Sequence, residues 1–264
     1  MGFSCYTEDR EIRFWYASGD SVMSGDEFHT FHEVLYIFSA EGWFLSEKKK
    51  TRLLPNTLIL IPKETYHNFV FEENSDYIRC RIWFSDISGF GGIAEECMNE
   101  IRVISEPGEV IERLFSELAE TADKAYSEAE RRMLLRSSVL RLLFEIKRGL
   151  HETGLSGVQS QSGLIQAATK IINEGYCENI SVGSIAARLF VSQSQLAHMF
   201  KKELNISIYK YITLKRILCT QKLIKSGVKA NEAARQSGFR DYSSFYRVYR
   251  KHCGEAPCRN KERE

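Results

Sequence analysis

The fold of the C-terminal part is decided by one stretch, Gly238-Phe239-Arg240-Asp241-Tyr242-Ser243-Ser244-Phe245-Tyr246-Arg247-Val248-Tyr249-Arg250-Lys251. Gly238 favours a turn, because a left-handed backbone costs glycine little, and Asp241 is a good N-cap for the helix that follows. Three apolar residues share the inward face of that helix, namely Phe245, Val248 and Tyr249. Ahead of the turn, a short helix carries small residues, Ala230, Ala233 and Ala234. This order of short helix, turn and longer helix predicts a helix-turn-helix unit.

The same plan occurs earlier in the chain. Ser181 can cap a short helix over residues 182–189, and Ser192 can cap a second helix over residues 193–203. The apolar face of this second helix consists of Leu196, Met199 and Phe200. A longer helix over residues 209–225 connects the two units. From residue 164 onward, the sequence therefore predicts an all-helical domain with two helix-turn-helix units.

Charge separates the two halves of the chain. Residues 160–264 hold 18 Lys and Arg against 8 Asp and Glu, a balance of +10, whereas residues 1–159 have a balance of −9 within the total of +1. A basic domain is suited to a polyanion. Acidic lipid is an alternative partner, but the basic residues are dispersed among predicted helices instead of being clustered beside a membrane segment. Double-stranded DNA is the partner that this pattern favours.

The C-terminal residues resemble the AraC/XylS family of bacterial regulators. The matching positions in the second unit are Gly238, Phe239, Asp241, Ser243, Phe245, Arg247, Tyr249, Arg250, Lys251, Gly254 and Pro257. Those in the first unit and the connecting helix are Ile185, Ala186, Ser192, Leu196, Phe200, Lys201, Lys202, Glu203, Tyr211 and Ile212. The resemblance covers residues 164–257 and implies a sequence-specific DNA-binding transcription regulator, which is not an enzyme and needs no cofactor. It also implies RNA polymerase as a further partner.

By this resemblance, the two outward helices enter successive major grooves of DNA. The residues expected to contact DNA from the first unit are Ser192, Gln193, Ser194, Ala197, His198, Lys201 and Lys202. Those from the second unit are Tyr242, Ser243, Ser244, Arg247, Arg250 and Lys251. Arg247 is expected to bond guanine O6 and N7 together, whereas the last basic residues of each helix are expected to meet phosphates. A solvated helix surface is the alternative interpretation of each residue.

Residues 1–90 are rich in β-formers. Short apolar runs cover residues 33–38, 57–62 and 77–84, and turn formers bound several of them. Many short strands at this spacing predict a small β-barrel or sandwich. His29, Glu33 and His67, with the intervening run from Pro55 to Pro62, resemble the cupin β-barrel that AraC/XylS regulators commonly carry. The predicted fold class is therefore α+β and multidomain, with an N-terminal cupin-like β-barrel, a following helical segment and a C-terminal all-α domain.

The barrel is predicted to bind a small-molecule effector. The candidate residues are His29, Glu33, His67, Arg79, Arg81 and Trp83. The last three alternate onto one face of a strand, and arginine beside an aromatic ring suits a sugar or another polar effector with an acidic group. Glu27 stands where metal-binding cupins have a histidine, and no metal is assigned. Imidazole and carboxylate groups can hold a divalent ion, so a metal-dependent cupin enzyme with an accessory DNA-binding tail is the alternative function. Another alternative is that His29 and His67 have only a structural role, as polar partners at a strand end or in a loop.

Residues 91–152 show a helical period. Four apolar residues recur at heptad-like spacing in its longer helix, namely Leu135, Val139, Leu142 and Ile146. Such a stripe can pair with a second subunit, and the resemblance implies a homodimer. Packing against the chain's own barrel is the alternative explanation of the same residues.

The rest of the sequence bounds the class of protein. Residues 153–163 are rich in Gly, Ser and Gln and predict a flexible linker, so the expected order is a barrel over 1–90, a helical segment over 91–152, the linker, and the DNA-binding domain over 164–264. The seven cysteines have no CxxC spacing, which is typical of reduced cytosolic thiols. We find no secretory signal and no apolar run of about 18 residues. A cytoplasmic protein without a membrane partner is expected.

Overall fold

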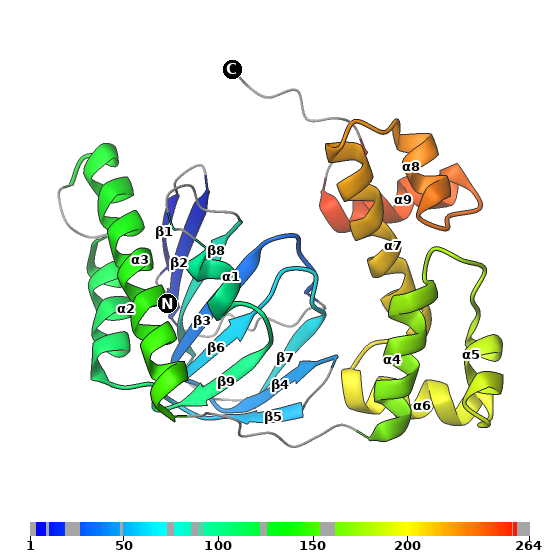
Figure 1. Cartoon of the computed structure of the whole chain (residues 1–264), viewed down its shortest axis with the longest axis horizontal. Coiled ribbons are helices and arrows are strands. Elements are labelled where there is room, and N and C mark those ends of the chain that lie inside the picture. Colours follow the sequence, from blue (N-terminus) through cyan, green and yellow to red (C-terminus); the bar gives the residue numbers. More distant parts are fainter. Residues whose placement is uncertain are drawn as a thin grey trace. The chain divides into compact units, whose positions relative to one another are not determined.

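The structure is a computed structural model of the chain, which describes residues 4–8, 11–18, 27–47, 50–72, 77–85, 90, 92–121, 126–153, 162–254 and 256–257. The chain divides into two compact units, residues 1–159 and 160–264 (Figure 1). The predicted linker falls almost entirely outside the described residues. In the part of the chain that is described, no helix combines the length and the apolarity needed to cross a bilayer.

Two antiparallel sheets build the part of the first unit that the structure describes. The strands of the larger sheet are, in spatial order, β1 (Ser4–Glu8), β2 (Ile12–Ser18), β8 (Ile78–Phe84), β3 (His32–Ser39), β6 (Thr57–Ile61) and β9 (Arg102–Ser105). Those of the smaller sheet are β5 (Lys50–Leu53), β4 (Gly42–Ser46) and β7 (His67–Phe71). No strand pair among the described residues joins the two sheets. The predicted β-rich N-terminal fold is thus confirmed, and its strand pairing is that of two open sheets.

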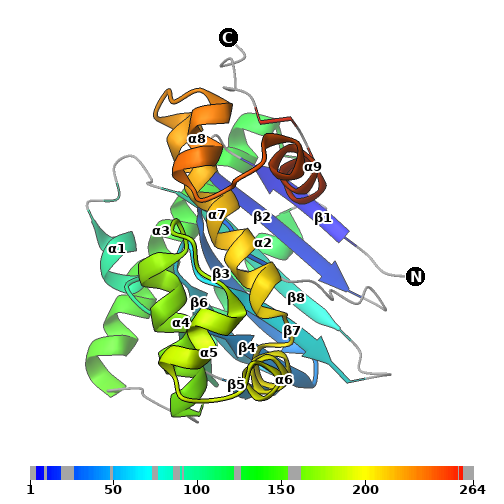
Figure 2. The same cartoon turned by 90° about the vertical axis from the view of Figure 1, so that its right-hand side faces the viewer.

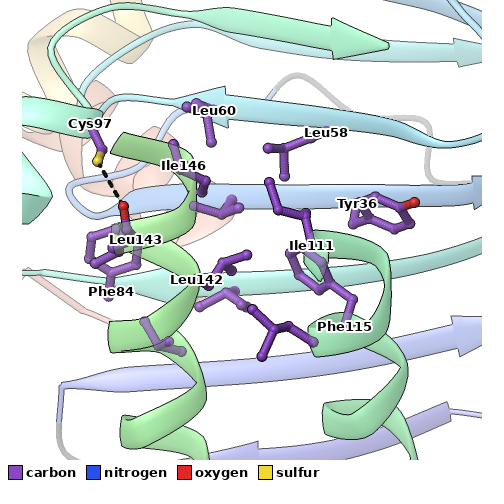
Figure 3. Close-up of a cluster of buried hydrophobic side chains, with 14 of the residues drawn as sticks. Tyr36, Leu58, Leu60, Phe84, Cys97, Ile111, Phe115, Leu142, Leu143 and Ile146 are labelled. Carbon is purple, nitrogen blue, oxygen red and sulfur yellow. Dashed lines mark hydrogen bonds between the residues drawn. The ribbon is translucent and has the colours of Figure 1, made fainter. Parts of the chain in front are cut away.

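The central strands β3 and β6 are buried on both faces, which explains their continuous apolar runs. On one face Tyr36 and Leu58 pack against the helices α2 (Glu109–Thr121) and α3 (Glu128–Thr153), as Figure 3 shows. On the other face Leu35 and Ile59 pack against Phe44 of the smaller sheet. Apolar burial on this scale is the main favourable term in folding. It holds the two sheets and the helices together as one unit.

The predicted dimerisation stripe lies inside this core. Leu135, Val139, Leu142 and Ile146 of α3 are each at most 2% exposed and belong to the same apolar cluster as Phe115 of α2. Figure 3 shows Leu142 and Ile146 in this cluster. The heptad-like spacing does mark one apolar face of the helix. That face covers the chain's own sheet, so these four side chains cannot contact a second subunit.

The segment after the larger sheet is also not wholly helical. A short helix, α1 (Ile93–Cys97), is followed by β9, which pairs antiparallel with β6 at the edge of the larger sheet. A short connection over residues 106–108 separates β9 from α2. The four residues of β9, Arg102-Val103-Ile104-Ser105, do not alternate between polar and apolar, so they carry no strand pattern.

Among its described residues the second unit has six helices, and three of them begin at the N-caps that the sequence predicts. The helices are α4 (Gly163–Gly175), α5 (Val182–Arg188), α6 (Gln193–Leu204), α7 (Ile208–Lys225), α8 (Ala230–Gln236) and α9 (Tyr242–Cys253). The side chains of Ser181, Ser192 and Asp241 accept backbone hydrogen bonds at the N-termini of α5, α6 and α9, which confirms the three predicted caps. Figure 2 views α6 and α9 nearly along their axes, at opposite ends of α7.

Candidate nucleic-acid interface and buried polar centre

Helix α6 has one buried and one exposed face. Leu196, Phe200 and Leu204 are buried, and the Ser192 hydroxyl accepts a hydrogen bond from the Gln195 amide at 3.1 Å. The predicted DNA-contacting residues of this unit are all exposed, namely Ser192, Gln193, Ser194, Ala197, His198, Lys201 and Lys202. The fold therefore places polar side chains along the start of the helix and lysines toward its end.

Helix α9 repeats this arrangement in the second unit. Phe245 and Tyr249 are buried against Ile217 and Ile224 of α7. The predicted contacts of this unit are likewise exposed, namely Tyr242, Ser243, Ser244, Arg247, Arg250 and Lys251. The Ser244 side chain and the Ser244 amide donate to Asp241 and lower the pKa of that carboxyl. The cap fixes the first turn of the exposed face.

The turns next to these helices contain features that we did not predict. Gly238 has φ +89°, and a Cβ atom there would lie 2.7 Å from the carbonyl oxygen of Cys177, so the turn tolerates only glycine. The equivalent turn of the first unit contains Phe190 at φ +56°, and this ring is 95% exposed. A cavity of about 760 Å³ lies beside the Gly238 turn, and Arg216 and Arg240 line it. A positive φ at phenylalanine leaves no recognisable pattern in the sequence, so the conformation of Phe190 could not be predicted.

The first unit contains a buried polar centre between its sheets. Glu27, His29, Glu33 and His67 each direct one nitrogen or oxygen into it, and these atoms all lie within 4.8 Å of one another. The Nε2 atoms of His29 and His67 lie 3.0 and 3.1 Å from Oε2 of Glu33. Arg81 completes the centre from β8. Its Nε lies 2.6 Å from Oε1 of Glu33, and its Nη2 donates to Oε1 of Glu27 at 3.0 Å.

Burial and ion pairing shift the pKa values in this centre in opposite directions, and ion pairing determines the net direction. Burial alone would lower the pKa of His67, but contacts with Glu27 and Glu33 raise that pKa to about 9. Burial alone would raise the pKa of Glu33, but Arg81 and the two histidines hold that pKa well below its ordinary value. Opposite charges within a few ångströms stabilise the charged forms. The centre is therefore a paired ionic network at neutral pH.

The structure brings together most of the predicted effector residues. His29, Glu33, His67 and Arg81 form the centre, and Arg81 lies over the Trp83 ring at 5.1 Å. Trp83 also contacts the rings of Trp15 and Phe31 at 4.3 and 4.4 Å between centroids. Arg79 forms a different contact: its guanidinium lies over the Tyr77 ring, 4.6 Å from the ring centroid.

Glu27 was missing from the predicted set, although it belongs to the centre. It is bound to His67 by a backbone bridge in addition to its side chain. Its spacing of two and six residues before His29 and Glu33 is the sequence signal that pointed to it.

Comparisons with known proteins agree with the helical geometry. A family model described as a helix-turn-helix domain matches residues 185–263. The uncharacterised regulator YijO of Escherichia coli is 27% identical over 146 residues, which are 55% of this chain and 51% of that protein. The Msm operon regulatory protein of Streptococcus mutans is 29% identical over 37% of this chain and 36% of its own length. The arabinose operon regulatory protein of E. coli is 29% identical over 50% and 44%. The matches thus span about half the length of these relatives, or less.

Proposed function

We propose that this chain, which is similar to AraC/XylS regulators, is a transcription regulator that binds specific sequences of double-stranded DNA. The observation that carries the proposal is the pair of helices α6 and α9. Each buries its apolar face in its own helix-turn-helix unit and exposes a polar and basic face. Such helices fit the major groove and contact base edges with their first turns. The chain is a regulator and not an enzyme, like the relatives named above.

Selection of binding sites by the full chain from a random duplex library tests this function. Enriched sites should contain two short conserved blocks about one helical turn apart, because each unit contacts its own groove. The variant His198→Ala with Arg247→Ala should enrich no sequence. Lys170→Ala, which removes an exposed lysine of α4 and leaves α6 and α9 intact, should select the same sites as the unmodified chain. Failure of the unmodified chain to enrich any sequence would refute the proposal.

The first unit is proposed to bind the effector in a cupin-like arrangement. The support is the buried polar centre with Trp15, Phe31 and Trp83 beside it, since ligand sites commonly combine apolar and aromatic walls with a few fixed polar groups. A sugar or another small polar molecule fits these groups. A thermal-shift screen of such compounds tests the proposal, because a ligand at 100 times its Kd adds about 2.7 kcal/mol of stability. A hit that persists in Trp83→Ala would argue against this location.

A homodimer is proposed to form through the outer side of α3 instead of its buried stripe. Met133 and Phe144 are 72% and 57% exposed, and residues eleven apart lie on the same side of a helix. Phe144→Glu should shift the sedimentation of the chain from dimer to monomer, whereas Glu128→Ala, at an exposed site in the first turn, should not. An unchanged dimer in Phe144→Glu would exclude this surface.

A further inference from the structure

The buried polar centre has the composition of a metal site. Two imidazoles and two carboxylates are ligands that divalent transition metals accept. Two ligands of one such ion lie at most about 4 Å apart, twice a bond of about 2.0–2.1 Å, and the four ligand atoms here lie within 4.8 Å of one another, so shifts of less than about 1 Å would let them share one ion. The size and the chemistry of the donor set therefore fit a metal ion.

The outer contacts of the two histidines fit a metal as well. Nδ1 of His29 lies 2.7 Å from the carbonyl oxygen of Phe31, and Nδ1 of His67 lies 3.1 Å from that of Thr65. In metal sites the ring nitrogen that does not bind the metal usually donates to a carbonyl or carboxylate, which orients the other nitrogen toward the ion. Both Nε2 atoms are oriented in this way, toward the centre.

The position of the cation is nevertheless already filled. Arg81 is 7% exposed and extends from β8, where its backbone lies opposite Leu35 of β3. Its guanidinium contacts both carboxylates of the centre, Glu33 at 2.6 Å and Glu27 at 3.0 Å. A guanidinium stays protonated in proteins. A divalent ion would have to share both carboxylates with this fixed positive charge at close range, where like charges repel strongly in a poorly solvated site.

We propose that Arg81 is the resident cation of this centre, that it takes the place of a metal ion among Glu27, His29, Glu33 and His67, and that it excludes divalent metals from the first unit. The ligand of this unit is then bound by a guanidinium network and not by a metal. Removing the charge of Arg81 should turn the centre into a metal site. This inference does not depend on DNA binding, so it can fail while the regulator function stands.

Metal titration of three forms of the full chain tests the proposal. Arg81→Met removes the charge and keeps an unbranched side chain, while Arg81→Lys keeps a positive charge. With Co²⁺ as the probe, we expect Arg81→Met to bind one ion per chain and to show the visible absorption of histidine-ligated cobalt. The unmodified chain and Arg81→Lys should show neither. Adding His67→Gln to Arg81→Met should abolish the signal, which separates this centre from surface ligands and free thiols.

Each outcome decides the matter. Stoichiometric, histidine-type cobalt binding by the unmodified chain would overturn the proposal, and so would a folded Arg81→Met chain that binds no cobalt. If Arg81→Met is too unstable to titrate, its thermal unfolding is measured with and without Zn²⁺. The proposal expects Zn²⁺ to raise the melting temperature of Arg81→Met and to leave that of the unmodified chain unchanged. No difference between the two chains would also overturn it.

Discussion

The two units of this chain differ in the kind of polar side chain that they bury. In the first unit the buried polar side chains include an ionic network, with Glu33 and His67 fully buried and Arg81 almost so. Among the described residues of the second unit, the buried polar side chains are hydroxyls only, namely Thr169, Thr213, Thr220 and Ser237. Each of these hydroxyls donates to the carbonyl four residues before it.

The two units therefore place their charged side chains in different positions. The second unit places its charged groups outside, on α6 and α9, and its interior is apolar apart from hydroxyls already bonded within helices. A partner can therefore meet those charges without any change in the core. The first unit places charge inside, where each group depends on the others, because an unpaired buried charge is costly. Changes in the first unit should thus act on stability, and changes in the second on affinity.

The largest expected effect is that of Glu33→Ala. Arg81 and His67 would remain buried without the carboxylate that pairs with both, which costs about 3–5 kcal/mol of unfolding free energy. All three tryptophans, at positions 15, 43 and 83, lie in the first unit, so tryptophan fluorescence during urea unfolding measures this unit alone. Glu128→Ala is the control, since Glu128 forms an exposed pair with Arg132 and such pairs contribute about 0–1 kcal/mol. Equal losses in the two variants would contradict the comparison.

A pH dependence should follow from His67. Its pKa is about 9 in the folded chain, against an ordinary value of 6.5. A group whose pKa rises on folding stabilises the fold fully below its unfolded pKa, and that contribution is lost as the pH rises through the folded pKa. The fluorescence-monitored stability of the first unit should therefore fall between pH 6.5 and pH 9, and His67→Gln should flatten the curve. A rise in stability over this range would show that His67 is neutral in the folded chain.

The second unit should respond to salt instead. Each neutralised phosphate contributes about −0.9 to the slope of log affinity against log salt, so about four contacts predict a loss of roughly a hundredfold between 50 and 200 mM. Lys201→Ala should make the slope less steep by about one. Lys147→Ala in the first unit, where Lys147 pairs with Glu96, should leave it unchanged. A flat dependence for the unmodified chain would count against the DNA-binding proposal.

Arg247 and Lys251 should differ within one helix. Arg247 lies near the start of the exposed face of α9, so Arg247→Ala should cost about 1–3 kcal/mol and relax the preference at one operator position. Lys251 lies one turn further on, so Lys251→Ala should weaken all sequences about equally and reduce the salt slope by about one. Affinities for an operator and a one-base variant decide this. If Arg247→Ala weakens both DNAs equally, Arg247 contacts phosphate.

How far the sequence could predict the structure also differs between the units. The caps at Ser181, Ser192 and Asp241 were predictable, because a cap depends on a few neighbouring residues. The ionic network was not, because Glu33 and Arg81 are 48 residues apart in the sequence and only strand pairing brings them together. The alternation of Arg79, Arg81 and Trp83 indicated a shared face without naming the partners. The apolar stripe on α3 was ambiguous for a similar reason, since a helix that covers its own sheet and one that covers a partner need the same spacing.

The smallest expected effect concerns the turn of the first helix-turn-helix unit. Phe190 has φ +56°, a conformation that costs a residue other than glycine about 1–3 kcal/mol. Because its ring is 95% exposed, it buries almost no apolar area in return. Phe190→Gly should therefore stabilise the second unit by roughly 0.5–1 kcal/mol, after the extra entropy of glycine in the unfolded chain is counted.

Circular dichroism of the helices during urea unfolding measures this change, with Asn205→Gly as the matched control. Asn205 ends α6 at φ +58°, and asparagine tolerates this conformation better than phenylalanine, so its replacement should gain less. DNA affinity is measured on the same two variants. If Phe190→Gly gains stability and keeps affinity, the ring takes no part in DNA binding and the interface consists of the polar faces alone. If it gains stability and loses affinity, the strained phenylalanine contacts DNA, and the second unit too keeps a costly feature for its function. A loss of stability would mean that the ring is not solvent-exposed in the folded chain.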